Sequence, residues 1–330
     1  MTAWTSPLRH DPVPALLSAG DPALTYFVRR DLLGEEPGLI SALWELSEAR
    51  RLLRKQQADG SWRYPGGNPE TTPGSNYAVL ETFRSLGVLV EMYGCDRSHP
   101  ALRAAAEYIF SCQTAEGDIR GILGNQYMPY YHAAILELLI KAGYADDPRV
   151  VAGLEWLLAV RQADGGWIVP LQAVPSRERT REIWPGPAVP PDRARPFSHL
   201  ATGMVLRAFA AHPAYRRHPH ALAAASLLKG RCFLADKYND RKDPAYWLKF
   251  QYPFWWTSLL TSLDTLARME FQVDDGAIRR GLDWFVANQG QDGLWQHGYD
   301  AGKRAHAAQF WVALAVCRVF RRFQEAATGS

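Results

Sequence analysis

One short pattern occurs three times: Gln57-Ala-Asp-Gly-Ser-Trp62, Gln162-Ala-Asp-Gly-Gly-Trp167 and Gln289-Gly-Gln-Asp-Gly-Leu-Trp295. Each copy ends a helix-like segment with a glutamine, an Asp-Gly turn and a tryptophan. A weaker copy, Gln113-Thr-Ala-Glu-Gly-Asp-Ile119, has lost the tryptophan, and residues 232–238 stand where a further weak copy is expected. One turn that recurs at intervals of roughly 50 residues indicates a repeat protein.

Composition excludes several classes of protein. The 330 residues are 47% hydrophobic and 12% aromatic, which is enough for a large core and unlike a disordered chain. A net charge of +3 is too small to indicate a nucleic-acid partner. The four cysteines show no CxxC spacing, residues 1–14 do not resemble a secretory signal, and no apolar run is long enough to span a membrane. We therefore expect a cytoplasmic protein without a cofactor, with magnesium and zinc as open alternatives.

Two kinds of helix alternate along the chain. Segments before the turns are half polar, as in residues 99–109, 147–158 and 275–285, and are predicted as outer helices. Segments after the turns are apolar nearly all round, which is typical of helices buried on every side. These inner helices are expected at residues 76–93, 126–144, 197–212, 254–271 and 305–323, with one more at 21–33. The prediction is an all-α fold, a single (α/α)6 toroid over residues 21–324, with an N-terminal extension (1–20) and a tail (325–330).

The turns resemble the QW repeat of squalene and oxidosqualene cyclases, whose α/α toroid also occurs in the β subunits of protein prenyltransferases. The resemblance covers residues 21–324 and implies a structural role for the motif residues, which tie neighbouring helices together in that family. They are Gln57, Trp62, Gln162, Trp167, Gln289 and Trp295. The roles are physically sensible, because an amide satisfies orphan groups at a helix end, glycine permits a left-handed turn and an indole covers the joint.

Two motifs of that family are missing. The cyclases protonate their substrate with an acid from a D-x-D-D motif, and the prenyltransferases hold zinc with an Asp, a Cys and a His. Neither pattern occurs here, and an Asp-rich diphosphate motif is also missing. The chain is thus identified as a divergent member of the superfamily, and ordinary class II cyclisation and protein prenylation are both disfavoured.

The connections that lead into the inner helices are long, and such loops on a rigid scaffold usually carry the binding residues. The loops are basic, and the first turns of the inner helices are aromatic, so we expect an apolar ligand with an anionic head. The candidate ligand-binding residues are Tyr77, Tyr130, Tyr131, His132, His199, Trp255, Trp256 and Trp311, with Arg195 and Lys249 for the head. The alternatives are aromatics that fill the core and a salt-bridged solvated rim.

Asp264 is the candidate catalytic residue, because it lies inside an apolar inner helix where a carboxyl group tends to stay protonated. Glu81 and Glu137 are similarly placed on two other inner helices. The alternative is a carboxylate bonded to a neighbouring inner helix. For a metal ion, His297, Asp300 and His306 are the weak candidates, and satisfied or exposed histidines are the alternative.

The leading functional hypothesis is a protein that binds and transforms a hydrophobic, isoprenoid-type ligand in a central aromatic cavity. A non-catalytic ligand-binding or scaffold toroid is the second hypothesis. The third is an (α/α)6 carbohydrate-active enzyme, for which Asp118, Asp300 and Glu182 could supply the paired carboxylates. Peripheral membrane contact through residues 39–44 is also considered, although a core-facing outer helix explains this stretch equally well.

Overall fold

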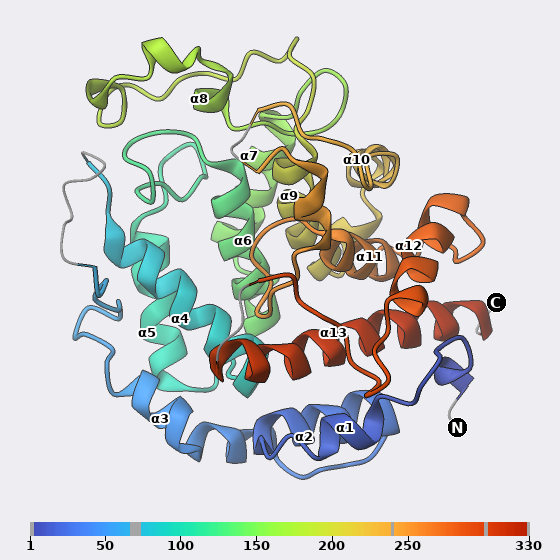
Figure 1. Cartoon of the computed structure of the whole chain (residues 1–330). Helices are drawn as coiled ribbons and strands as arrows, with labels where there is room; N and C mark the ends of the chain where they lie inside the picture. The colour runs from blue at the N-terminus through green and yellow to red at the C-terminus, as the bar shows by residue number, and fades with distance from the viewer. Residues whose placement is uncertain (1–2, 67–73, 239–240, 300–302, 329–330) are drawn as a thin grey trace. The chain divides into compact units, whose positions relative to one another are not determined.

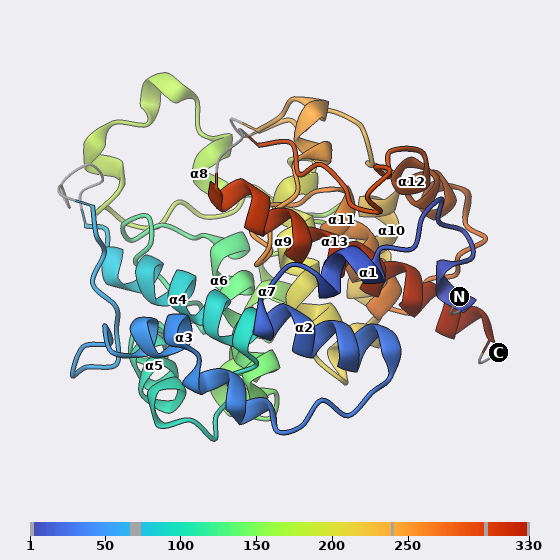
Figure 2. The same cartoon turned by 60° about the horizontal axis from the view of Figure 1, so that its bottom comes forward.

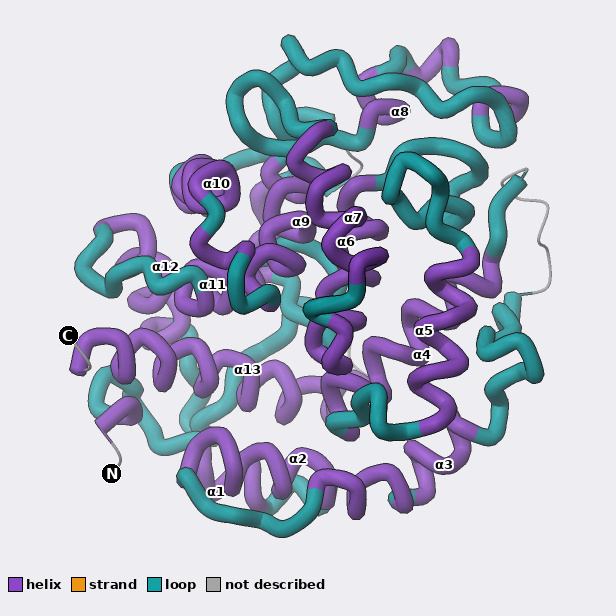
Figure 3. The backbone as a smooth tube through the Cα atoms, turned by 180° about the vertical axis from the view of Figure 1, so that it is seen from behind, coloured by secondary structure: helices purple, strands orange, loops and turns teal. Residues whose placement is uncertain are grey.

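The computed structural model describes residues 3–66, 74–238, 241–299 and 303–328, and this part of the chain forms helices and loops without a strand (Figure 3). The predicted all-α class is therefore confirmed. None of the described helices combines the length and the apolar character needed to cross a membrane.

The chain divides into two compact units. Unit 1 contains Met1–Leu39, Ala225–Asp236 and Arg241–Ser330, and unit 2 contains Ile40–Ala224 and Lys237–Asp240. Unit 1 is thus built from both ends of the sequence, whereas unit 2 is almost continuous.

Unit 2 alternates outer and inner helices as predicted. Its inner helices are α4 (Tyr77–Tyr93), α6 (Pro129–Leu139) and α9 (His199–Ala211). Its outer helices are α3 (Ser47–Leu53), α5 (Pro100–Ser111), α7 (Pro148–Ala159) and the first half of α10 (Pro219–Lys229). Helix α6 packs against α9 and α7, and α4 packs against α5 (Figures 1 and 2). Every residue of α9 except the last is buried, as expected for a helix that is apolar on all sides.

Short elements complete unit 2. Helix α6 continues into a π-helical turn, η5 (Ile140–Tyr144), and the long loop after α7 carries α8 (Pro170–Ala173), η6 (Ser176–Glu178) and η7 (Arg181–Ile183). The 3-10 segments η3 (Ile40–Glu45) and η8 (Tyr215–Arg217) precede α3 and α10.

Unit 1 contains the inner helices α2 (Pro22–Val28), α11 (Leu259–Arg268) and α13 (Lys303–Thr328), and the outer helix α12 (Gly276–Ala287). Helix α2 continues into a π-helical turn, η2 (Arg29–Leu33), and α13 packs against α11, α2 and α1 (Val13–Leu17) (Figure 1). Two 3-10 segments, η1 (Ala3–Thr5) and η9 (Pro244–Leu248), also belong to this unit.

Acids cap several helices where the sequence predicted helix starts. Asp147 and Asp275 accept hydrogen bonds from the first backbone amides of α7 and α12, and Asp21 does so for α2. A carboxylate at this position satisfies otherwise unpaired N–H groups and interacts favourably with the helix dipole.

One predicted helix starts later than expected. Residues 254–271 were expected to be helical throughout, but α11 begins only at Leu259. Ser258 caps it through a reciprocal capping box with Thr261, and the nearby Pro253 cannot donate a backbone hydrogen bond. Trp255 and Trp256 consequently precede the helix instead of lying in its first turn.

Candidate functional site

The four motif turns, residues 56–62, 113–119, 161–167 and 289–295, share one backbone geometry. In each turn the second residue donates its N–H to the carbonyl of the sixth, at 2.8 Å, and the donors are Gln57, Thr114, Gln162 and Gly290. This register makes Gln56 the counterpart of Gln113 and Gln289, one residue earlier than the sequence pattern indicated. Gln57 itself bonds within its own turn, to the hydroxyl of Ser61.

The first glutamine of a turn joins two segments. Its side-chain amide donates both to the turn glycine carbonyl and to a carbonyl at the start of the next outer helix. For Gln56 these acceptors are Gly60 and Ala101, at 2.9 and 2.8 Å, and for Gln113 they are Gly117 and Arg149, at 2.7 and 2.8 Å. Gln289 instead bonds to Gly293 and to the backbone of residues 9 and 10, near the N-terminus.

The tryptophan of a turn is hydrogen-bonded to the helix that precedes it. The indole Nε1 of Trp62, Trp167 and Trp295 donates to a carbonyl ten residues earlier, at 2.7–2.8 Å. Trp247, which lies beyond the weak copy expected at residues 232–238, makes the same kind of bond to Leu234 in that segment. The indole stands 13 residues after its acceptor, against ten in the other turns, so the sequence pattern does not reveal this copy.

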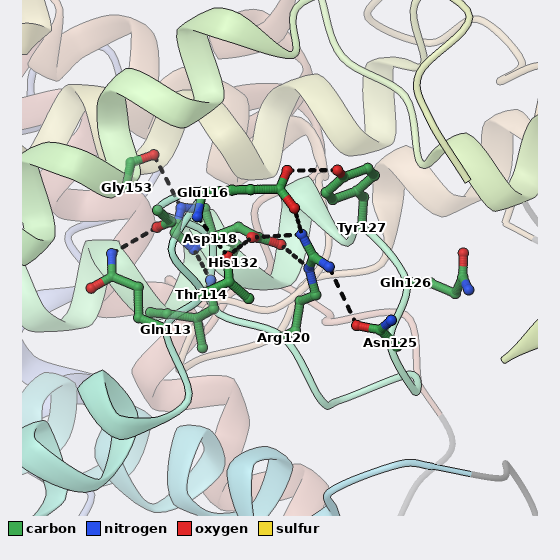
Figure 4. A network of polar contacts seen from close by, with 12 residues as sticks. Gln113, Thr114, Glu116, Asp118, Arg120, Asn125, Gln126, Tyr127, His132 and Gly153 are labelled. Atoms are coloured by element: carbon green, nitrogen blue, oxygen red, sulfur yellow. Dashed lines mark hydrogen bonds and ion pairs between the residues drawn. The ribbon is translucent and has the colours of Figure 1, made fainter. Parts of the chain in front are cut away.

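His132 supports the turn that lacks a tryptophan (Figure 4). Its Nδ1 accepts a hydrogen bond from the N–H of Ile119, so Nε2 carries the proton and donates to the Gly153 carbonyl. In the neighbouring copies, the hydroxyls of Thr82 and Thr202 accept the equivalent bond. Burial lowers the pKa of His132 to about 4, against smaller opposing effects, so the ring is neutral. Both ring nitrogens thus bind backbone groups and neither is directed at a ligand.

Asp118 and Arg120 extend this network (Figure 4). The fully buried Asp118 accepts hydrogen bonds from Thr114 and from the Nε of Arg120, at 2.5 and 2.8 Å. Arg120 also bonds to Glu116 and stacks over the ring of Tyr127, 4.5 Å from its centroid. Burial opposes the charge of Arg120, but its bonds to Asp118 and Glu116 raise its pKa overall. An acid held in this way does not resemble a glycosidase carboxylate, and Glu182 is exposed on its loop.

A buried ion network joins the inner helices of unit 2. Glu137 on α6 accepts hydrogen bonds from Arg207 on α9, at 2.7 Å, and from Lys141, at 2.7 Å. Lys141 also pairs with Glu91 of α4 at 2.5 Å. Burial alone would raise the pKa of Glu137, but the charges of Arg207 and Lys141 reverse that effect and hold it low. Glu137 is therefore a carboxylate, bonded to a neighbouring inner helix.

Asp264 has the corresponding arrangement in unit 1. One carboxylate oxygen accepts from Arg268 at 2.8 Å, and the other from Arg322 of α13. Loss of hydration lowers the pKa of Arg322 to about 10, while Asp264 acts in the opposite direction, so the arginine stays charged at neutral pH. Two guanidinium groups favour the ionised form of Asp264. This geometry matches the structural alternative for Asp264 more closely than a general acid.

Further polar contacts join α13 to η2 and to the start of α2. Arg318 donates to Asp31 at 2.8 Å and to the hydroxyl of Tyr252 at 2.9 Å. The ring of Tyr252 stacks on Trp311, with centroids 5.7 Å apart and planes 4° apart, and the indole of Trp311 donates to Asp21. Trp311 is 3% exposed, so it contributes to the core of unit 1.

Two cations of the segment before α11 lie over aromatic rings. Arg241 is 4.2 Å from the Trp256 ring centroid, and Lys249 is 4.9 Å from Tyr246 and 5.7 Å from Tyr299. We call these five residues, with Trp255, the aromatic–cation patch. Trp255 and Trp256 are half-buried and contact each other edge to face, and Tyr299 is 44% exposed. Of the predicted ligand-binding residues, the structure brings together Trp255, Trp256 and Lys249 here.

Apart from Trp311, the other predicted ligand-binding residues lie in unit 2. Tyr130 and Tyr131 begin α6 with ring centroids 4.5 Å apart, and Tyr77 begins α4 beside Tyr64, at 5.0 Å. His199 is buried in the first turn of α9. Arg195 has an exposed side chain that pairs with Asp192 at 3.2 Å. The tyrosines form two aromatic pairs, whereas Arg195 belongs to the solvated loop.

Among the described residues, the predicted metal ligands do not form a cluster. His297 is buried, and its Nδ1 accepts the backbone N–H of Tyr299. Asp300 lies outside the described residues, and so does the side chain of His306. Within the described part of the chain, no three His, Cys, Asp or Glu residues are grouped to hold a metal ion.

Two cavities lie away from these residues. One, of about 230 Å³, is lined by Leu282 and Val286 of α12 and by Phe320 and Phe323 of α13. The other, of about 520 Å³, is lined by Arg97, Arg103, Lys141 and Tyr144. Neither is lined by a residue that was predicted to bind the ligand.

The arginine partners of the inner-helix acids were not predicted from the sequence. Arg207 lies within the apolar helix α9, and Arg318 and Arg322 lie within α13. An arginine in an otherwise apolar helix is as unusual as an acid there, because each needs a buried partner. Pairing the two kinds of exception would have predicted both networks.

Comparisons with known proteins give matches among solved structures alone: no protein-family model and no curated protein matches the sequence. A variant of the type II terpene cyclase MstE from Scytonema, in complex with geranylgeranyl dihydroxybenzoate, is 14% identical, with 95% of this chain and 86% of that chain covered and a TM-score of 0.48. The same cyclase without ligand is 13% identical, with coverage of 96% and 98% and a TM-score of 0.44. A protein from Actinoplanes is 17% identical, with coverage of 87% and 100% and a TM-score of 0.32. Values this low give no residue-by-residue correspondence, so each residue's role has to follow from its own contacts.

Proposed function

We propose that the protein binds an apolar small molecule of isoprenoid type that carries an anionic head. The aromatic–cation patch is the site. The observation that carries the proposal is the position of Arg241 and Lys249 over the faces of Trp256, Tyr246 and Tyr299.

The patch offers both kinds of contact that such a ligand needs. The part-exposed rings of Trp255 and Trp256 provide apolar surface. Lys249 has no carboxylate partner among the described residues, so its ammonium group is available to an anion. A cation on an aromatic face keeps its outer hydrogens for an oxyanion while its position is fixed by the ring.

The acids of the inner helices favour binding of the ligand without acid catalysis. Protonation of an alkene needs a neutral, strongly acidic carboxyl group. Both Glu137 and Asp264 are carboxylates bonded to arginines of neighbouring inner helices. We therefore assign these two acids a structural role, and the proposal does not include a reaction.

Affinity measurements with two probes test this site. Geranylgeranyl phosphate is expected to bind more tightly than geranylgeraniol in a titration of tryptophan fluorescence. Lys249→Ala should weaken binding of the phosphate by about tenfold, the loss expected for one charge-assisted hydrogen bond, and should leave the alcohol unaffected. Trp256→Leu should weaken both probes.

Matched substitutions provide the controls. Lys55→Ala removes an exposed lysine of unit 2, and Trp184→Leu removes a half-buried tryptophan of a unit 2 loop, so both should bind the probes as the wild type does. Equal affinities for the phosphate in Lys249→Ala and Lys55→Ala would contradict the assignment of the head. Native mass spectrometry of the protein from its host, showing a retained ligand without an apolar chain, would contradict the ligand class.

A further inference from the structure

The third motif turn departs from the other three at its first position. The shared backbone register places Arg161 where the other turns have Gln56, Gln113 and Gln289. The surroundings of this position are otherwise those of a motif turn, because the preceding helix, the turn itself and the buried Trp167 are all present. A cation therefore occupies a site that elsewhere holds a neutral amide.

Arg161 lacks the acceptors that the glutamines have. Gln56 and Gln113 donate to the second residue of the next outer helix, and the corresponding residue of α10 is His220. The Nε and Nη1 atoms of Arg161 are buried and have no hydrogen-bond partner among the described residues. Leaving a charged donor in this state is costly, so the arrangement calls for an acceptor that the described residues do not supply.

Other basic groups surround Arg161. Arg193 donates its Nε to the carbonyl of Arg161 at 2.9 Å, which brings its guanidinium group to the same turn. The charge of Arg161 is the largest cause that lowers the pKa of His220, and His218, whose ring lies 5.3 Å from that of His220, adds to it. No carboxylate within the described ranges pairs with Arg161 or Arg193. Like charges held together without a counter-ion repel one another, and an anion would relieve that repulsion.

We propose that Arg161, Arg193 and His220 form a binding site for a tetrahedral oxyanion, a phosphate or phosphoryl group. Two guanidinium groups and an imidazole can donate to three different oxygens of such a group, whereas a planar carboxylate offers two. Arg193 and His220 are exposed, so the anion reaches the site from solvent.

This site and the proposed ligand site have no residue in common. Arg161 follows the outer helix α7 in unit 2, whereas the aromatic–cation patch belongs to unit 1. The inference therefore does not rest on the proposed function, and either can fail without the other.

Calorimetric titration with inorganic phosphate at constant ionic strength tests the site. The wild type should bind phosphate, and Arg161→Gln should weaken binding by about tenfold or more, as expected when charge-assisted hydrogen bonds are lost. This variant restores the residue of the other turns, so it should fold normally. Arg54→Gln removes the same charge from an exposed position of unit 2 and should bind phosphate like the wild type.

Two further measurements identify the anion and the donors. Sulfate should compete with phosphate, and acetate at the same concentration should not. His220→Asn should weaken phosphate binding less than Arg161→Gln, because it removes an imidazole and leaves both guanidinium groups. Absence of phosphate binding in the wild type, unchanged binding in Arg161→Gln, or equal competition by acetate would each overturn the proposal.

Discussion

The inner helices of the two units contain the same arrangement of one acid and two basic side chains, but the side chains are buried to different degrees. In unit 2, Glu137 pairs with Lys141 four residues later and with Arg207 of the next inner helix. In unit 1, Asp264 pairs in the same way with Arg268 and with Arg322. The side chains of Arg207 and Glu137 are 4% and 3% exposed, whereas those of Arg322 and Asp264 are 27% and 7% exposed.

Because the arrangement occurs in both units, its role can be inferred. A single reaction needs one acid at one place, whereas a means of joining inner helices is needed wherever two of them meet. In both units an acid pairs with a basic residue four positions later and with an arginine of the next inner helix, and this recurrence favours a structural role for each acid. The difference in burial then predicts different costs for breaking them.

Glu137→Gln is expected to have the largest effect. The substitution leaves Arg207 buried without its counter-charge, which should lower the free energy of unfolding by about 3–5 kcal/mol. Urea denaturation followed by circular dichroism measures this. A loss below about 1 kcal/mol would show that the burial of the pair in unit 2 has no energetic consequence.

Acid should destabilise unit 2 first, through His132. Its folded-state pKa of about 4 lies below the ordinary value of 6.5, so the unfolded chain takes up the proton first. Stability is full above pH 6.5 and is lost as the pH falls, by about 2 kcal/mol between pH 6.5 and 5. Hydrogen exchange read by mass spectrometry should show this loss in the helices of unit 2. His132→Asn, which keeps an acceptor for the Ile119 N–H, should flatten the dependence.

The motif tryptophans should contribute equally in the two units. Trp167→Phe in unit 2 and Trp295→Phe in unit 1 each remove one indole hydrogen bond and part of a fully buried ring. Each substitution should cost about 2 kcal/mol in thermal or urea unfolding. Costs that differ by more than about 1 kcal/mol would show that the two turns are not equivalent.

Asp264→Asn should cost less than Glu137→Gln, about 1–2 kcal/mol, because Arg322 and Arg268 keep contact with water when the carboxylate is lost. Binding of geranylgeranyl phosphate should be unchanged. If a substrate is identified and this variant loses turnover while the fold stays intact, Asp264 has a chemical role and the comparison between the units fails.

Leu39→Ser should have the smallest effect on stability, within about 0.5 kcal/mol, since the side chain is 80% exposed. The expected contact with a membrane surface depends on this residue more than on Leu43, which is buried. Sedimentation with liposomes of the wild type, but not of Leu39→Ser, would support membrane contact. Equal sedimentation of both would remove residues 39–44 from that role.

Periodicity predicted the helices well and the motif register poorly. An apolar face and a half-polar face differ over many residues, so the inner and outer helices could be assigned from the sequence. The first copy contains two adjacent glutamines, Gln56 and Gln57, and composition cannot show which one has its amide against the next helix. Trp247 was missed as the counterpart of the motif tryptophans because its loop is longer.

The candidate site was harder to predict than the fold, since pairing between distant residues decides it. Asp264 and Glu137 are recognisable as unusual acids, but the partners that set their ionisation come from helices far along the chain. The position of Trp256 depends on the delayed start of α11, which a local cap determines. Lys249 could be predicted to lie in a long loop before an inner helix, whereas its contact with two tyrosine rings could not.

The bond between Gln289 and the backbone of residues 9 and 10 has a consequence for synthesis of the chain. Unit 2 is nearly continuous, so its helices can pack while the rest is still being translated. Residues 3–39 of unit 1 cannot pack against α11, α12 and α13 until these helices have left the ribosome. During that interval the apolar face of α2 has none of its final partners from the C-terminal segment, and this is when the nascent protein most needs a chaperone.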